Sequence, residues 1–433
     1  MRLQATRTLL ELHLRHTTTK HLWKGPRAGA ETALVLGALR RRGTLDAILQ
    51  TYSSRKLPLV KPETLACLRI AAFELLFLDD SPQHAVVHAA VQNAKELERY
   101  KDTGFLNALL RGVMRGCKRV PAGEATDMRR ILPLNGESHL FGRSVFPDPR
   151  HDAAGFLAAR ASVPRWIAER RLDEWGLERA LVCLGLQAET PHTYVRMAAG
   201  REDEVRAALE SAGIAFSDGP HARLLDLPPS VKIGPVFQAA GSMLSVQDAV
   251  ASQVAPFLAP EPGWNVLDYC AAPGGKTTHL GELVGPTGQV TACDVDGERL
   301  ALVGENAERL GLGNIACVHL PAQLTGGFDA VLVDAPCSNT GVLARRPEAR
   351  WRVRRKDLPG FAQRQFKILR QASAQVRRGG ALVYSTCSLE DEENLGVVRA
   401  FVERSDFELL EARRVAPDEG AGDGGFMARL RRL

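Results

Sequence analysis

The sequence predicts a multidomain protein with an all-α N-terminal domain, a small α/β middle domain and a C-terminal α/β domain. Its 433 residues correspond to about three domains at roughly 150 residues each. The apolar pattern is helical in the first third of the chain, whereas short apolar strands alternate with helices in the last. The 45% hydrophobic and 24% charged content is typical of globular proteins and excludes collagen-like and wholly disordered classes.

The first domain is predicted from successive amphipathic helices between residues 29 and 119. Apolar residues there recur at steps of three and four, as in Leu65, Leu68, Ala72, Leu75 and Leu76. The stretch from Pro121 to Pro149 is rich in Pro, Gly and charge and has weak periodicity, which predicts an irregular linker. Residues 1–145 are therefore assigned to an all-helical domain plus linker.

Residues 146–238 are predicted to form the small α/β domain. A helix is expected over Trp166–Leu186, and strands over Thr193–Met197 and Leu224–Leu227.

The third domain, residues 239–433, is predicted to contain a mostly parallel sheet with helices on both faces. Its expected strands are Trp264–Asp268, Gln289–Asp294, Ile315–Leu320, Phe328–Asp334 and Ala381–Thr386. Ligands bind such sheets at the carboxyl ends of the strands, where the polar motifs of this domain also fall.

Charge and cysteine content predict a soluble cytoplasmic protein. No apolar run reaches the 18 residues of a membrane helix, and residues 1–15 lack the continuous apolar segment of a secretory signal. The eight cysteines include no C-x-x-C pair, which indicates free thiols in a reducing compartment. A net charge of +6 permits an anionic partner without requiring one.

The first motif is VLDYCAAPGGKTT at residues 266–278, a strand followed by a turn of small residues and then a helix. The turn lets a ligand approach the backbone, and the helix start offers free N–H groups. A P-loop is excluded because its first glycine would fall at Cys270 and because Pro273 has no N–H. A tight turn without a ligand remains the alternative.

Asp294 ends the next strand, where a nucleoside-binding sheet places a carboxylate on ribose hydroxyls. A helix cap is the alternative role for an acidic residue at this position.

Two cysteines follow neighbouring strands: Cys337 in DAPCSNTG and Cys387 in YSTCS. A thiol at a strand end can reach a substrate, so these two are the candidate reactive cysteines. A metal site is not expected, because no His or further Cys lies at ligand spacing near them. Buried, inert thiols are expected at Cys67, Cys117, Cys183, Cys293 and Cys317.

The run RRPEARWRVRRK at residues 345–356 has seven basic residues, one acidic residue and Trp351. A solvated surface is the default interpretation, but its place after a candidate catalytic loop favours contact with RNA phosphates and stacking by the tryptophan. Arg40, Arg41 and Arg42 are expected to add basic charge in the helical domain.

Three motifs of the third domain are, in chain order, LDYCAAPGGKT, DAPCS followed by TG, and YSTCSLEDEEN. Together they resemble the RNA cytosine-5 methyltransferases that use S-adenosylmethionine. The front end, with LGALRRRGTLDAIL, LRIAAFELLFL and GFLNALLRGV, resembles a NusB-like RNA-binding domain. This pairing is similar to that of 16S ribosomal RNA cytosine-5 methyltransferases of the RsmB (Sun/Fmu) type. It implies a class I, Rossmann-like methyltransferase domain.

The resemblance implies an S-adenosylmethionine site without a metal, and catalysis by Cys387, Cys337, Asp334 and Lys276. The cofactor would be bound by Cys270, Ala271, Ala272, Pro273, Gly274, Gly275, Lys276, Asp294 and Asp334.

By the family pattern, Cys387 is the nucleophile and Cys337 assists product release. A thiolate adds to carbon 6 of cytosine because carbon 5 is otherwise too poor a nucleophile to attack the methyl group. Lys276 and the sulfonium are candidates for activating the thiol, and Asp334 is a candidate for hydrogen bonding to the base. Because the base must be unstacked, a loop or junction target is favoured.

Three departures from the family pattern stand out. Pro321 replaces an expected Asp that contacts the adenosine, Asn339 replaces a small residue beside Cys337, and Arg196-Met197-Ala198 replaces Arg-Val-Asn. The alternatives are a transfer RNA cytosine-5 methyltransferase and a non-catalytic ribosome assembly factor. The expected partner is 16S ribosomal RNA or the assembling small subunit, bound by a monomer, with no membrane or DNA partner.

Overall fold

The computed structural model describes residues 1–433 except 16, 19–21, 23–28, 79–81, 125 and 322–323. Contacts divide the chain into a first unit, Met1–Glu189 with Leu343–Arg354, and a second unit, Thr190–Val342 with Arg355–Leu433. The expected boundaries near residues 145 and 238 followed composition along the chain, whereas these units follow contacts in space. Residues 343–354 therefore fold with the first unit, although the sequence on both sides of them belongs to the second.

The first unit is built mainly of helices, as predicted. They are α1 (Arg2–Arg15), α3 (Gly29–Arg40), α4 (Arg42–Tyr52), α5 (Pro62–Phe77), α6 (Gln83–Glu96), α7 (Thr103–Arg115), α8 (Ala153–Arg160), α9 (Arg165–Ala188) and α15 (Ala349–Arg352), with 3₁₀ turns η1 (Leu57–Leu59) and η2 (Tyr100–Asp102). Helix α5 begins with Pro62 and is buried continuously from Thr64 to Leu76. Because it is apolar nearly all round, it forms the centre against which α1, α3, α4, α6 and α7 pack.

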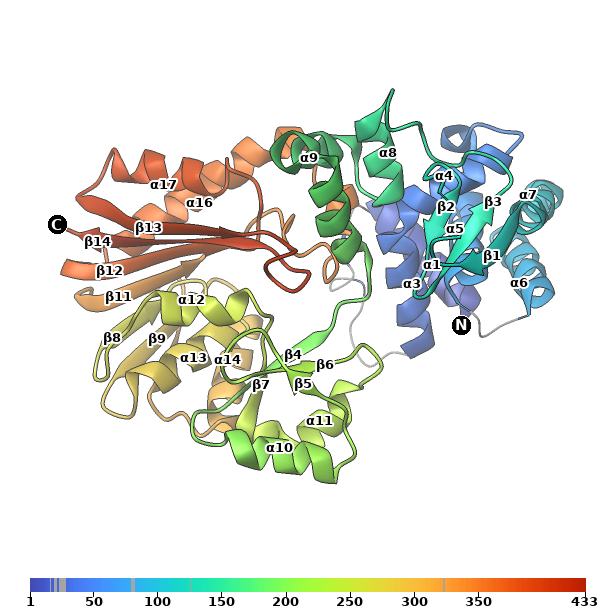
Figure 1. Ribbon diagram of the computed structural model, residues 1–433. Helices are drawn as coiled ribbons and strands as arrows, with labels where there is room; N and C mark the ends of the chain where they lie inside the picture. The colour runs from blue at the N-terminus through green and yellow to red at the C-terminus, as the bar shows by residue number, and fades with distance from the viewer. Residues whose placement is uncertain (16, 19–21, 23–28, 79–81, 125, 322–323) are drawn as a thin grey trace. The chain divides into compact units, whose positions relative to one another are not determined.

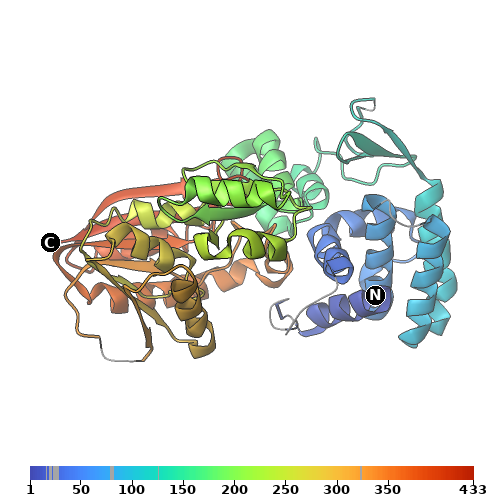
Figure 2. The same cartoon turned by 90° about the horizontal axis from the view of Figure 1, so that it is seen from below.

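The expected linker contains a small antiparallel sheet. Its strands are β1 (Cys117–Pro121), β2 (Ile131–Pro133) and β3 (Glu137–Phe141), in the order β1-β3-β2. Leu132 and Phe141 are fully buried in the helical core. The expectation of an irregular connection was wrong here, because strands this short carry too few apolar residues to reveal their period. Figure 2 shows this sheet next to the end of α7.

The second unit contains a four-stranded antiparallel sheet in the order β5-β6-β4-β7. Its elements are β4 (Thr193–Met197), α10 (Glu202–Ser211), β5 (Ser217–Asp218), β6 (Leu224–Leu227), α11 (Ile233–Ala240), η3 (Gly241–Met243) and β7 (Leu244–Val246). The two predicted strands have the predicted bounds. The predicted helix Trp166–Leu186 lies within α9, which belongs to the first unit and is interrupted at Gly176.

The second unit is completed by a seven-stranded sheet in the order β10-β9-β8-β11-β12-β14-β13. The strands are β8 (Asn265–Asp268), β9 (Gln289–Asp294), β10 (Ile315–His319), β11 (Phe328–Asp334), β12 (Val376–Thr386), β13 (Phe407–Val415) and β14 (Gly425–Arg432). The first five in this order are parallel, and β14 and β13 are each antiparallel to their neighbours.

Helices cover both faces of this sheet, as predicted. Figure 1 shows α12 (Ala251–Phe257), α13 (Gly275–Val284) and α14 (Gly297–Arg309) on one face, and α16 (Leu358–Ser373) and α17 (Leu395–Val402) on the other. A 3₁₀ turn, η4 (Arg355–Asp357), precedes α16. Burial on both faces explains why β11 reads as an almost unbroken apolar run.

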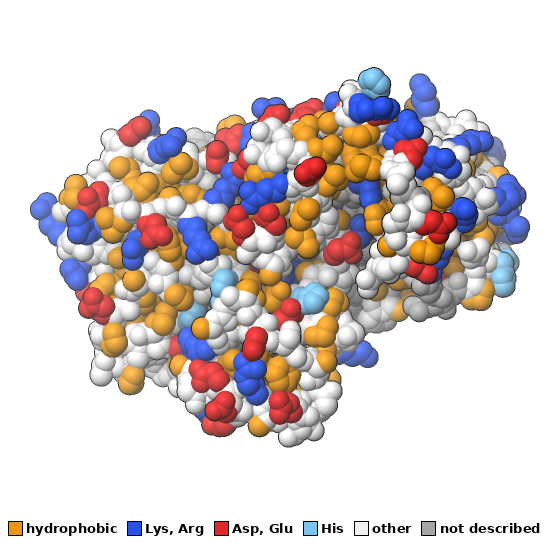
Figure 3. Space-filling view, in the orientation of Figure 1, with side chains coloured by type: hydrophobic (Ala, Val, Ile, Leu, Met, Phe, Trp, Pro, Cys, Tyr) orange, Lys and Arg blue, Asp and Glu red, His pale blue; other side chains and the backbone are white. Residues whose placement is uncertain are grey.

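On the face seen in Figure 3, basic and acidic side chains are interspersed, as the small net charge suggests. Among the described residues, no helix is long and apolar enough to cross a bilayer.

Candidate active site

Four neighbouring parallel strands of the large sheet end at one edge, and the predicted site residues follow them. Asp334 of β11 pairs with Ser385 of β12, and Leu332 of β11 pairs with Asp268 of β8. The β9 strand lies on the other side of β8. Because parallel strands share one carboxyl edge, the loops after β8, β9, β11 and β12 meet there.

The two candidate reactive cysteines are in contact. The Sγ atoms of Cys337 and Cys387 lie 3.2 Å apart. Cys337 is buried, whereas Cys387 is half-buried. The hydrogen bond to Cys387 and burial raise the pKa of the Cys337 thiol well above its ordinary value, so Cys337 holds its proton.

Asn339 links the two cysteines. Its Nδ2 donates to the backbone oxygen of Cys337 at 2.9 Å, and its Oδ1 accepts from the Cys387 thiol at 3.3 Å. Its φ is +65°, a left-handed conformation that asparagine tolerates better than most residues. The departure expected only to add bulk therefore contributes specific hydrogen bonds.

A buried carboxylate, Glu393, was not predicted as a site residue. It accepts hydrogen bonds from the backbone N–H of Ser338 at 2.9 Å and from the hydroxyl of Ser388 at 2.6 Å. These two serines directly follow the two cysteines. Its signal in the sequence was its place within the motif YSTCSLEDEEN, to which no role beyond that of Cys387 was assigned.

Lys276 and Asp334 form an ion pair with an Nζ to Oδ2 distance of 2.7 Å. The hydroxyl of Ser385 donates to the other carboxylate oxygen at 2.8 Å. Burial alone would lower the pKa of Lys276, but Asp334 and, more weakly, Cys387 raise it above the ordinary value. The structure thus brings together two predicted catalytic residues, Lys276 and Asp334. The ammonium of Lys276 is also close enough to Cys387 to interact with it electrostatically.

The glycine-containing turn after β8 lies against the end of β9. The N–H of Ala272 donates to Asp294 Oδ2 at 3.1 Å. Gly274 has φ +105°, and a Cβ there would lie 3.1 Å from Val303. This residue must therefore be glycine for the turn to pack on α14. Burial is the main cause of a raised pKa for Cys270, which makes it an unreactive thiol.

Asp268, at the end of β8, is a further site residue that the sequence analysis missed. The hydroxyl of Thr277 donates to Oδ2 at 2.7 Å, while Oδ1 is buried without a partner among the described residues. Burial raises the pKa of Asp268 to about 7. The signal was its position immediately before the small-residue turn.

Not every other thiol is buried as expected. Cys67, Cys183 and Cys293 are buried, but Cys117 is half-buried and Cys317 is exposed. The expectation failed at Cys317 because β10 is an edge strand of the large sheet and is incompletely covered.

The basic run does not form one solvated RNA-binding surface, because its centre is part of the first unit's core. Arg350 is fully buried, and its guanidinium donates to backbone oxygens of Arg40, Ser162, Gln187 and Leu343. The predicted stacking residue Trp351 donates its indole N–H to the Leu39 oxygen at 3.0 Å.

The expected RNA contacts were therefore wrong for Arg350 and Trp351, which serve the fold. Arg40 is also buried and donates to the Ala344 oxygen at 2.8 Å, so the cluster at residues 40–42 is likewise used in packing. Arg41 pairs with Glu189 at 2.5 Å, and Arg42 lies over the Trp351 ring. Exposed members of the run are Arg346, Arg354, Arg355 and Lys356.

Two other departures have clear positions. Arg196 on β4 is buried and pairs with Glu282 of α13, which also accepts from Arg223 at 2.7 Å. The four-stranded sheet is therefore tied to the helix that carries Lys276 in its first turn. Pro321 is exposed directly after buried Leu320, and its effect on adenosine binding stays a prediction.

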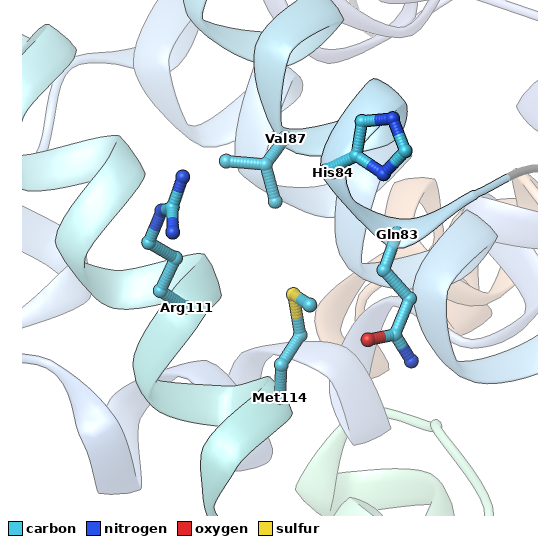
Figure 4. A pocket seen from close by; sticks show the side chains of 5 residues that line it. All are labelled: Gln83, His84, Val87, Arg111 and Met114. Atoms are coloured by element: carbon cyan, nitrogen blue, oxygen red, sulfur yellow. The ribbon is translucent and has the colours of Figure 1, made fainter.

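A hollow of about 390 Å³ lies elsewhere, on the first unit. Figure 4 shows its lining side chains, with Gln83, His84 and Val87 on α6 and Arg111 and Met114 on α7. Val87 is buried and forms an apolar wall, whereas Arg111 and His84 are exposed. None of the predicted site residues lines this hollow.

Comparison with known families agrees with the two predicted end domains. Residues 255–431 match the family 16S rRNA methyltransferase RsmB/F, and residues 2–115 match the NusB family. The chain is 32% identical over 390 residues to the probable ribosomal RNA small subunit methyltransferase B of Bacillus subtilis (strain 168), covering 88% of this chain and 81% of that protein. It is 32% identical over 414 residues to ribosomal RNA small subunit methyltransferase B of Escherichia fergusonii, covering 92% and 89%.

Solved structures confirm the fold class. The crystal structure of PH0851 matches with a TM-score of 0.73 at 22% identity, covering 100% of this chain and 98% of that one. A methyltransferase homologue protein from Pyrococcus horikoshii matches with a TM-score of 0.57 at 28% identity, covering 65% and 99%.

Proposed function

The chain belongs to the RsmB/F family of 16S rRNA methyltransferases, and on this premise we propose how its own residues carry out the reaction. The activity is S-adenosylmethionine-dependent methylation of carbon 5 of a cytosine in 16S ribosomal RNA. The observation that supports the mechanism is the 3.2 Å contact between Cys337 and Cys387 at the carboxyl edge of the sheet.

The residues around the small-residue turn fit the cofactor. When bound, S-adenosylmethionine supplies an electrophilic methyl group on a sulfonium. The unpartnered Oδ1 of Asp268 would accept from its amino group, and Asp294 would bind the ribose hydroxyls. At Gly275 an added Cβ would meet only the Val246 oxygen, at 3.9 Å, so the backbone is open to a ligand.

Cys387 is the proposed nucleophile. Its thiolate would add to carbon 6 of cytosine, and the electron pair moved to carbon 5 would form the new bond to the methyl carbon while the bond from that carbon to sulfur breaks. Lys276 favours the thiolate by its positive charge, and Asp334 holds the ammonium in place at 2.7 Å. The side chain of Asp334 is 34% exposed, so it can also contact the base.

Cys337 is proposed to act in product release. Before reaction, its proton is held by the contact with Cys387. Once Cys387 is bonded to carbon 6, its sulfur no longer carries charge, so this cause of the raised pKa of Cys337 is removed. Cys337 can then lose its own proton to solvent, and its thiolate accepts the proton from carbon 5 as the carbon 5–carbon 6 double bond re-forms and the bond between carbon 6 and Cys387 breaks.

The hollow between α6 and α7 is the proposed contact for an unpaired stretch of the RNA. Helix α7 has no acidic residue and carries exposed Arg111 and Arg115, which suit phosphates. The apolar wall formed by Val87 and Met114 suits the face of an unstacked base.

The test is transfer of a labelled methyl group to 16S ribosomal RNA and to transfer RNA in parallel, followed by mapping of the modified base. We expect 5-methylcytosine in the ribosomal RNA. Modification of transfer RNA alone would support the first alternative. Binding of RNA with no methyl transfer to either substrate would support a non-catalytic assembly factor.

A further inference from the structure

Glu393 is a carboxylate in the core of the catalytic edge. It lies six residues after Cys387, just before α17, and its exposed fraction is 0%. Besides Ser338 and Ser388, it accepts from Nε2 of Gln365 on α16 at 2.9 Å. The Ser338 hydroxyl adds a further, very short bond. One side chain thus joins three separate segments of the second unit.

We propose that Glu393 is a positioning residue that holds the Cys337 loop and the Cys387 turn together, so that both sulfurs reach the same base. This rests on the proposed function of the two cysteines. Glu393 accepts hydrogen bonds from the residue after each cysteine, and among the described residues it forms no hydrogen bond to either sulfur. It therefore sets the distance between the cysteines, and although its charge is a minor cause of the raised pKa of Cys337, it does not touch the reacting atoms.

A stabilising role alone does not account for this carboxylate. Burial raises the pKa of Glu393, and the hydrogen bonds from Ser338, Ser388 and Gln365 oppose this. Within the described part of the chain its hydrogen-bond partners are all neutral groups. An apolar residue of similar size often fills a buried site at equal or lower cost, so a hydrogen-bonded carboxylate at this position points to a need for defined geometry.

Further hydrogen bonds join the Cys337 loop and the Cys387 turn, and together with Glu393 they form what we call the clamp. The backbone oxygen of Glu393 accepts from the hydroxyl of Tyr384 at 2.6 Å, which ties the backbone at Glu393 to β12. The N–H of Gly341 donates to the Cys387 oxygen at 2.9 Å, and the N–H of Leu389 donates to Thr340 at 3.0 Å. The two segments are thus tied together directly after the cysteines.

The test separates geometry from charge with two variants. In Glu393→Gln the amide oxygen can still accept from Ser338 N–H and Gln365, and its NH2 can donate to the serine hydroxyls. In Glu393→Met all these bonds are lost. We expect kcat to fall about 100-fold in Glu393→Met, the size expected for a misplacement of about 1 Å, and less than tenfold in Glu393→Gln. KM for both substrates should change little.

A second readout does not depend on methylation. Diamide takes two electrons and two protons from a thiol pair and leaves a disulfide. The rate at which it joins Cys337 to Cys387 in the full chain, followed by peptide mapping, reports the distance between the sulfurs. We expect this rate to fall at least tenfold in Glu393→Met and to recover in Glu393→Gln. If the wild-type chain failed to methylate cytosine, the proposed function would fail, yet the disulfide rate would still test the clamp.

Controls keep the result decisive. Asp391→Asn alters an exposed carboxylate of the same turn, 3.6 Å from Arg414, and should leave both rates unchanged. If Glu393→Met does not fold, Ser338→Ala combined with Ser388→Ala removes two hydroxyl donors and should slow both rates several-fold. Wild-type kcat and disulfide rate in Glu393→Met, or in this double variant, would overturn the proposal.

Discussion

The Sγ atoms of Cys337 and Cys387 lie 3.2 Å apart although 50 positions separate the two residues in the sequence. The parallel pairing of β11 with β12 produces this contact, since Asp334 lies opposite Ser385 and each cysteine follows its strand within a few residues. The two thiols therefore have distinct, testable roles.

Cys387→Ala should abolish methyl transfer because it removes the proposed nucleophile for carbon 6, while Cys337 is assigned to removal of the carbon 5 proton. Cys337→Ala should still form the covalent bond but release it slowly, leaving a protein–RNA adduct that survives denaturing gels. Labelled RNA and gel mobility measure both. Residual methylation by Cys387→Ala would show that the nucleophile is wrongly assigned.

Asn339 should matter in two separable ways. Asn339→Gly removes both hydrogen bonds without strain and should lower kcat about tenfold, which corresponds to about 1.4 kcal/mol. Asn339→Ala should also lower the melting temperature, because a left-handed φ of +65° costs about 1–2 kcal/mol with a Cβ. Kinetics and thermal unfolding of the pair measure this. Equal melting temperatures for the two variants would contradict it.

Asp268 should make stability depend on pH. Its pKa is about 7 in the folded protein and about 3.9 unfolded, so the folded state binds the proton more tightly. The resulting stability is complete below pH 4 and is lost as pH rises through 7. Asp268→Asn lacks this loss, so its melting temperature should exceed that of the wild type more at pH 8 than at pH 5. Asp203→Asn, at an exposed position on α10, is the control and should show no such trend.

Arg350 should be essential for the fold of the first unit. Burial is the main cause of its pKa being lowered to about 9, and its guanidinium satisfies four backbone oxygens. Arg350→Met leaves these oxygens unpaired, at a cost of about 3 kcal/mol or more, so the melting temperature should fall by on the order of 10 °C. Arg346→Ala, at an exposed position of the same segment, should have little effect. An unchanged transition in Arg350→Met would refute this role.

Arg111 should contribute to RNA affinity. Arg111→Gln should weaken binding and reduce the slope of log affinity against log salt by about 1, as for one lost phosphate contact. Filter binding over a range of salt concentrations measures this. Arg165→Gln is the matched control, because that exposed arginine of the first unit is already paired with Asp152 and Glu169. If both variants lost affinity equally, the surface of α6 and α7 would have no special role.

Much of the catalytic sheet was predictable. The strands Gln289–Asp294 and Phe328–Asp334 have their predicted bounds, because a parallel sheet buried on both faces requires continuous apolar runs. The same logic placed Asp294, Asp334, Cys337 and Cys387 at one edge. The small sheet at residues 117–141 was missed because its strands are too short for a period to show.

The sequence by itself determined the enzyme class, the domain types and the edge of the sheet that carries the chemistry, because motifs and apolar periods are local in the chain. Only the tertiary structure decided that Glu393 is buried between the cysteine loops and that Arg350 is a core residue rather than an RNA contact. A charged side chain looks the same in sequence whether solvent or buried partners satisfy it. Those partners come from distant segments, and only folding brings them together.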